Sequence, residues 1–285
     1  IYKKRGPHHS YGGPAYYIQM ALKQNWLAYL FAVVLILTYM GGFNLLASYN
    51  VAETFKEFSW ATSRTPLAIG GILAVLMSVS ILGGTRRLTD VTGLLVPVMA
   101  IIYLGVGSIV IAVNYHNIPD MFSAIFTNAF DFQSMFGAFA GSAMMLGIKR
   151  GLYSNEAGVG SAPNAAASAS VSHPAKQGLV QMLSVFIDTM IICTFTAFVV
   201  LSSGITFPDK AKGAPIVKEA MATVLGQGVA QVFVSVALFL FAFTTLVGNF
   251  YYAEVNFRFL LGKIEIKHWM LTVFRLVAAA LVFCG

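Results

Sequence analysis

Two adjacent threonines, Thr244 and Thr245, bring hydroxyl groups into the otherwise apolar run LFLFAFTTLVGNFYYAE. Phe241 precedes Thr244 by three residues, so in a helix its carbonyl lies one turn back on the same face. Two hydroxyl oxygens and one carbonyl oxygen suit a hard cation such as Na⁺ better than a soft metal. A hydrogen bond from each threonine to a carbonyl of its own helix is the alternative interpretation.

An amide and a carboxyl group occur inside two other apolar runs. Asn44, in YMGGFNLLASYN, can donate to a carboxylate or accept from an ammonium group; hydrogen bonding between helices would explain it equally well. Asp188 lies within VQMLSVFIDTMIICTF. An ionised carboxyl at that depth in a bilayer costs at least ~2.5 kcal/mol. We therefore expect Asp188 to face the protein interior, where it would ligate a cation, carry a proton or accept a hydrogen bond.

The sequence lacks the patterns of an enzyme site. None of the five histidines forms H-E-x-x-H or lies deep in an apolar run, and there is no G-x-S-x-G and no P-loop. The two cysteines, Cys193 and Cys284, indicate neither a disulfide framework nor a metal cluster. We predict that the protein is not an enzyme and binds no cofactor besides a coupling ion.

Composition indicates the elements that hold these side chains. Of the 285 residues, 58% are hydrophobic and 10% charged, with a mean hydropathy of +0.75. Soluble domains are about 25% charged, so this composition argues against a soluble enzyme, and its apolar content against disorder. Apolar runs near ~20 residues predict membrane-spanning helices. Seven are expected, at 26–50, 66–84, 92–113, 132–152, 178–203, 228–252 and 268–285.

Charge predicts how these helices are oriented. With seven spans, the loops on the N-terminal side carry most of the 18 lysines and arginines, and loop 114–131 on the opposite side carries none. By the positive-inside rule, the N-terminal end is expected in the cytoplasm. The net charge of +7 then reflects topology, and no nucleic-acid partner is predicted. The small-residue loop 154–177 is expected to be a linker with a short helix from Pro163 onward, or a loop that closes over a vestibule.

The fourth segment, FQSMFGAFAGSAMMLGIKRG, differs from the others because Gly137, Gly141 and Ser142 lie in its middle. Glycine weakens a helix by about 1 kcal/mol relative to alanine. One interpretation is tight helix packing through small residues. The other is a helix that unwinds near Phe139–Ser142, so that free amides face an anionic group such as a carboxylate.

The run KRGLYSNEAGVGSAPNAAASASVSHPAKQGLVQMLSVFIDTMIICTFTAFVVLSSG resembles the sodium:alanine/glycine symporters, the amino acid carrier family. Supporting stretches are YGGPAYYI at 11–18, LGGTRRLTDVTGLLVPVMA at 82–100 and FAFTTLVGNFYYAE at 241–254. The resemblance implies Na⁺-coupled symport of a small neutral amino acid across the cell membrane, by alternating access. It also implies an all-α, LeuT-type fold built from inverted repeats, with one discontinuous helix among about seven in this chain.

The same resemblance implies how the chain is organised. We expect a single transmembrane domain, cut at both ends, with 1–131 from the first repeat and 132–285 from the second. The chain begins at Ile1 and stops at Gly285 within an apolar run, which favours a fragment.

Site residues carry over from the resemblance by position. Phe241, Thr244 and Thr245 match the spacing of a sodium site that uses one carbonyl and two hydroxyls. The positions expected to bind substrate are Asn44, Gly137, Phe139, Ala140, Gly141, Ser142, Met145, Gly248 and Asn249. Many family members carry Gln near Ala47 and Trp near Asn249, so the resemblance leaves the choice of amino acid open.

Rival functions remain at this point. A related transporter could couple to H⁺ or carry another solute, with Asp188 as the proton carrier; an ion channel and an intramembrane enzyme are further alternatives. The lipid bilayer is an expected partner, and the sequence leaves the oligomeric state open.

Overall fold

The structure, a computed structural model, consists almost entirely of helices. It forms two compact units, one comprising Ile1–Tyr103 with Gln231–Gly285 and the other Leu104–Ala230. The residues it describes are 2–5, 10–82, 84–129, 145, 147–149, 151, 156–205, 213–262 and 268–285.

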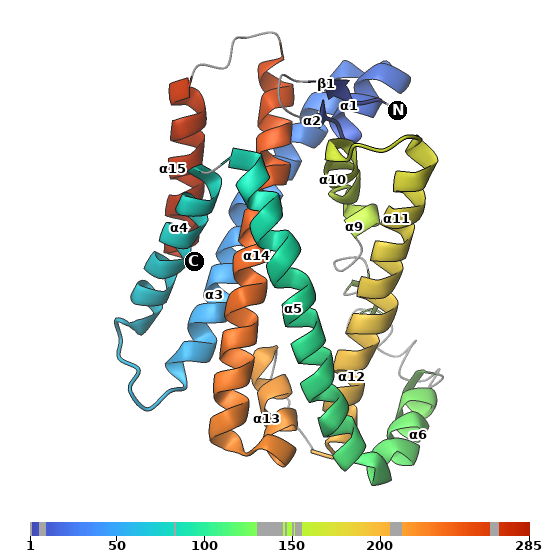
Figure 1. Ribbon diagram of the computed structural model, residues 1–285, viewed down its shortest axis with the longest axis vertical. Coiled ribbons are helices and arrows are strands. Elements are labelled where there is room, and N and C mark those ends of the chain that lie inside the picture. The colour runs from blue at the N-terminus through green and yellow to red at the C-terminus, as the bar shows by residue number, and fades with distance from the viewer. Residues whose placement is uncertain are drawn as a thin grey trace. The chain divides into compact units, whose positions relative to one another are not determined.

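The first unit contains most of the long apolar helices (Figure 1). A two-stranded antiparallel hairpin near its start pairs Lys4 with Tyr11 and Arg5 with Ser10. Its elements are β1 (Lys4–Arg5), β2 (Ser10–Tyr11), α1 (Pro14–Ala21), α2 (Asn25–Ile36), the π-helix η1 (Leu37–Phe43), α3 (Asn44–Lys56), α4 (Thr65–Leu82), the start of α5 (Gly84–Val113), most of α14 (Gln227–Leu261) and α15 (His268–Cys284).

The second unit combines shorter helices with one long interrupted helix. Pro174 occupies the first turn of α11, where a missing amide hydrogen does no harm, and the His173 side chain caps it by accepting from the Ala175 amide at 3.2 Å. Its elements are the end of α5, η2 (Tyr115–Asn117), α6 (Ile118–Ala129), α9 (Glu156–Val159), α10 (Ala162–Ser168), α11 (Pro174–Phe186), the π-helix η3 (Ile187–Ile192), α12 (Cys193–Ser202) and α13 (Ala214–Leu225).

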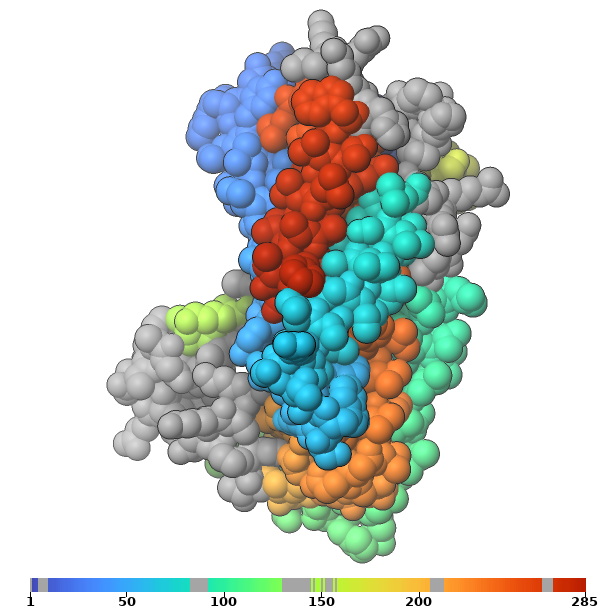
Figure 2. Space-filling view, turned by 90° about the vertical axis from the view of Figure 1, so that its left-hand side faces the viewer, coloured from blue at the N-terminus to red at the C-terminus, as the bar shows by residue number. Residues whose placement is uncertain are grey.

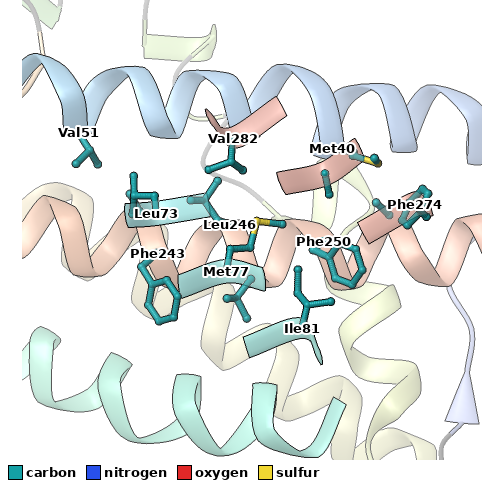
Figure 3. Packing of buried hydrophobic residues seen from close by; sticks show 14 of the residues in the cluster. Met40, Val51, Leu73, Met77, Ile81, Phe243, Leu246, Phe250, Phe274 and Val282 are labelled. Carbon is teal, nitrogen blue, oxygen red and sulfur yellow. The ribbon is translucent and has the colours of Figure 1, made fainter. Parts of the chain in front are cut away.

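An apolar cluster holds the first unit together (Figure 3). Its side chains come from η1, α3, α4, α14 and α15, and large members such as Leu73, Leu246 and Phe250 are almost completely buried. Helices α4 and α15 lie side by side in both views (Figures 1 and 2). They approach closely at Gly70, where an added Cβ would lie 3.1 Å from the Phe283 carbonyl oxygen.

The N-terminal helix α1 packs against the end of α14. Tyr16 is buried, its hydroxyl donates to the Val255 carbonyl at 3.4 Å, and its ring packs edge-on against Phe259. Burial raises the pKa of Tyr16 to about 12, so the phenol stays neutral. The Arg258 guanidinium lies 5.2 Å from the centre of the Tyr11 ring, a cation–π contact.

The predicted membrane-spanning helices are largely present. Five described stretches are long and apolar enough to cross a bilayer, and Trp269–Cys284 is a shorter apolar helix. The fourth predicted segment, 132–152, falls mainly outside the described residues. The five stretches are Asn25–Lys56, Thr65–Leu82, Thr92–Val113, Pro174–Ser202 and Gln227–Leu261.

An all-α integral membrane protein is therefore confirmed as the fold class. The count of seven helices, the LeuT-type inverted repeats, the discontinuous helix and the cytoplasmic N-terminal end stay predictions.

Candidate substrate and ion site

A hydrogen bond between two buried amides joins α3 to α14. The Asn249 Nδ2 donates to the Asn44 Oδ1 at 3.0 Å, and the two side chains are 4% and 0% exposed. These residues are 205 positions apart, and both were predicted to bind substrate. The structure thus brings together two of the predicted residues, in a unit that also contains the main apolar cluster.

A change of helix type directly precedes Asn44. Residues Leu37–Phe43 form a π-helix, which contains Gly41 and Gly42 and continues into α3. A π-helix inserts an extra residue per turn, and such segments occur frequently at functional sites. Apart from the chain neighbours and the local helix backbone, none of the described residues places a heavy atom within 4 Å of where a Cβ would stand on either glycine. The sequence analysis missed this wider turn, because its only signal was the glycine pair.

Among the further buried polar residues of α3 are Ser48 and Thr54, and Ser48 is the one nearer to Asn44. Its side chain is 0% exposed and lies one turn after Asn44 on the same face. Among the described residues, the Ser48 Oγ and the Asn44 Nδ2 are buried without a hydrogen-bond partner. Sequence reasoning missed Ser48, although its spacing of four residues from Asn44 was visible.

The predicted sodium ligands lie on α14, in the same unit. The Thr244 Oγ donates to the Phe241 carbonyl at 2.9 Å. Two of the three oxygen atoms predicted to bind Na⁺ therefore lie next to each other on one face of the helix. This hydrogen bond is also one from a threonine to its own helix, the alternative interpretation. Thr245 has an exposed side chain. Gly248 is another predicted substrate residue. Beyond its chain neighbours and the local helix backbone, the described part of the chain places no heavy atom within 4 Å of a Cβ built on it.

A hydroxyl that donates to a carbonyl keeps oxygen lone pairs for a cation. Hard oxygen ligands of this kind match Na⁺. Among the described residues there is no group of three His, Cys, Asp or Glu side chains that could hold a metal ion.

Asp188 lies in the π-helix η3, within the span formed by α11, η3 and α12. We expected it to face the protein interior, but its side chain is exposed in this chain, because little of this span is covered by other described elements. Desolvation raises the pKa of Glu156, although part of its side chain is exposed, and the negative charge of Asp188 raises that pKa further.

The remaining predicted substrate residues belong to the other unit. Met145 is a half-buried residue in helical conformation. Gly137, Phe139, Ala140, Gly141 and Ser142 lie outside the described residues, so the predicted unwound segment is untested.

Comparison with known proteins covers the entire chain. The model of the sodium:alanine symporter family matches residues 1–285. The amino-acid carrier protein AlsT of Bacillus subtilis is 41% identical over 285 residues, 100% of this chain and 59% of AlsT. The probable sodium/glutamine symporter GlnT of the same organism is 38% identical, over 100% of this chain and 58% of GlnT.

A relative from a second organism matches a similar share of the chain. The sodium/alanine symporter AgcS of Methanococcus maripaludis is 36% identical over 280 residues, 96% of this chain and 60% of AgcS. The chain therefore spans about three-fifths of the length of these curated relatives.

Proposed function

We propose that this chain, which belongs to the sodium:alanine symporter family, takes part in Na⁺-coupled symport of a small neutral amino acid across the cell membrane. The family match over all 285 residues is the observation that carries this proposal. Relatives named as a sodium/alanine symporter and a probable sodium/glutamine symporter support Na⁺ as the coupling ion and a neutral amino acid as the cargo.

The proposed mechanism is alternating access. Na⁺ and the amino acid both bind the outward-open state, and their combined binding free energy shifts the population towards closure. The Na⁺ gradient then drives uptake of the amino acid.

Each candidate residue has a proposed role. The Phe241 carbonyl and the hydroxyls of Thr244 and Thr245 hold Na⁺, while Asn44 and Asn249 border the substrate pocket. Gly248, the neighbour of Asn249 in the chain, is proposed to border the pocket as well. The segment proposed to meet the substrate carboxylate consists of Gly137, Phe139, Ala140, Gly141 and Ser142, with Met145 following it.

Replacing both hydroxyls tests the ion site. In the full-length protein reconstituted into liposomes, Thr244→Ala with Thr245→Ala should raise the Na⁺ concentration for half-maximal uptake at least tenfold, because two oxygen ligands are lost. Thr54→Ala is a matched control, since Thr54 also donates to a carbonyl three residues back, Val51, at 2.8 Å. An unchanged Na⁺ dependence in the double variant would remove the ion assignment.

Proton coupling is the second candidate, and one observation favours it. Desolvation, and after it the negative charge of Asp188, raises the pKa of Glu156. Carboxyl groups in or beside membrane-spanning segments can relay protons in transporters. Concentrative uptake driven by a pH gradient in Na⁺-free buffer would favour this candidate over the first.

A further inference from the structure

Asn44 and Ser48 are buried polar residues that lie between buried apolar residues of η1 and α3. The positions Met40, Asn44, Ser48 and Val51 recur at helical spacing, and all four side chains are buried. Met40 and Val51 belong to the apolar cluster drawn in Figure 3, on either side of the two polar residues in the sequence. Asn249 is likewise flanked along its helix by cluster members.

Polar side chains are costly in these apolar surroundings unless their hydrogen-bonding groups are paired. A buried polar group without a partner destabilises a protein by about 1–3 kcal/mol, and such groups in native structures call for an explanation. Here the Asn44 Nδ2 and the Ser48 Oγ both lack a partner among the described residues. A ligand that pairs with both atoms would satisfy them.

The unpaired atoms define the chemistry of that ligand. An amide N–H requires an acceptor, whereas the Ser48 hydroxyl can accept or donate. A carboxamide supplies both functions, with its oxygen towards Asn44 and its NH₂ towards Ser48. If the two asparagine amides are turned over together, their mutual hydrogen bond survives and a carboxamide turned the same way still matches.

A neutral ligand group is favoured over a charged one. Asn44, Ser48 and Asn249 are all uncharged, and the cluster around them is apolar. Burying an unpaired charge there would be far more costly than burying an amide.

We propose that Asn44 and Ser48, with Asn249 orienting Asn44, bind a side-chain carboxamide of the transported amino acid. This inference rests on the proposed function and specifies its substrate class: the protein selects asparagine or glutamine over apolar amino acids of the same shape. A site built to hydrogen-bond a substrate group discriminates against analogues that lack the group, because its polar atoms then stay unpaired.

Competition in the wild-type protein is the first test. The full-length protein in liposomes takes up labelled L-alanine under a Na⁺ gradient, and unlabelled amino acids compete. L-Asparagine should inhibit at a concentration at least tenfold lower than the similarly shaped L-leucine, and L-glutamine at least tenfold lower than L-methionine. The inference would be overturned if L-leucine inhibited at a concentration equal to or lower than that of L-asparagine, and L-methionine at one equal to or lower than that of L-glutamine.

A variant then tests whether Ser48 contributes to the preference for carboxamide side chains. Ser48→Ala should reduce the ratio of leucine to asparagine inhibitory concentrations at least threefold, because one hydrogen bond to the carboxamide is lost. Ser80→Ala is the matched control: Ser80 is also buried, but its Oγ donates to the Leu76 carbonyl at 2.9 Å. An unchanged ratio in Ser48→Ala would mean that Ser48 does not contact the carboxamide.

Failure of the inference is distinguishable from failure of the proposed function. Na⁺-dependent alanine uptake without any amide preference overturns the carboxamide site alone. Absence of Na⁺-dependent uptake for every neutral amino acid tested overturns the proposed function, and the carboxamide site with it.

Discussion

At the residue scale, the amide pair Asn44–Asn249 is a buried polar contact whose two members depend on each other. Each amide is surrounded mainly by apolar side chains, so each relies on the other for its 3.0 Å hydrogen bond. Removing one partner leaves a buried polar group exposed to an apolar environment. Replacing both amides by apolar side chains of similar shape leaves no unpaired polar group at this contact.

A double-mutant cycle should reveal this dependence. We expect Asn44→Leu and Asn249→Leu to lower stability individually by about 1–3 kcal/mol. The double variant should be destabilised by clearly less than the sum of the two. Thermal unfolding of the detergent-solubilised full-length protein measures the three variants against wild type. Additive effects would mean that the two side chains act independently.

At the element scale, a close contact between two helices of the first unit involves Gly70 of α4. An added Cβ would lie 3.1 Å from the Phe283 carbonyl oxygen, a backbone atom of α15 that cannot rotate away. Small residues at such positions let helix backbones approach closely in membranes. The packing of α4 against α15, seen in Figure 2, therefore depends on this glycine.

Enlarging Gly70 should separate these two helices. We expect Gly70→Val to destabilise the protein by about 1–3 kcal/mol through overpacking, detected as a lower unfolding temperature in detergent. Gly71→Ala is the control, because its Cβ would meet only the Phe283 ring, at an ordinary 3.8 Å. Equal unfolding temperatures for Gly70→Val and wild type would show that α15 can move away without loss.

The positions of helices were easier to predict from the sequence than the contacts between them. The apolar run 178–203 predicted the span Pro174–Ser202, and the short helix expected from Pro163 onward is α10 (Ala162–Ser168). Both follow from local signals, since apolar length and proline position act within the segment itself. The structure extends the expected first span, 26–50, to Asn25–Lys56, because polar residues continue the helix beyond its apolar part.

The site required information that no local pattern contains. The bond between Asn44 and Asn249 joins positions 205 residues apart, so only packing shows it. Ser48 is an ordinary serine in the sequence, and its burial without a partner is visible only in the folded unit. The π-helix η1 was hidden for the same reason, since glycine pairs occur in many conformations.

At the scale of the whole molecule, composition and family membership lead to the same class of protein. A chain with 10% charged residues, and with five helices able to cross a bilayer in its described part, suits a membrane transporter. The family match covers residues 1–285. Coupling itself is a property of the complete protein, because it requires that Na⁺ and substrate favour the same state.

Uptake under imposed gradients tests the central claim most directly. The full-length protein is reconstituted into liposomes, and uptake of labelled L-alanine, L-asparagine and L-glutamine is measured with an inward Na⁺ gradient, with Na⁺ replaced by K⁺, and with a pH gradient alone. We predict concentrative uptake only under the Na⁺ gradient. Equal uptake after replacement by K⁺, or accumulation driven by the pH gradient alone, would contradict Na⁺-coupled symport.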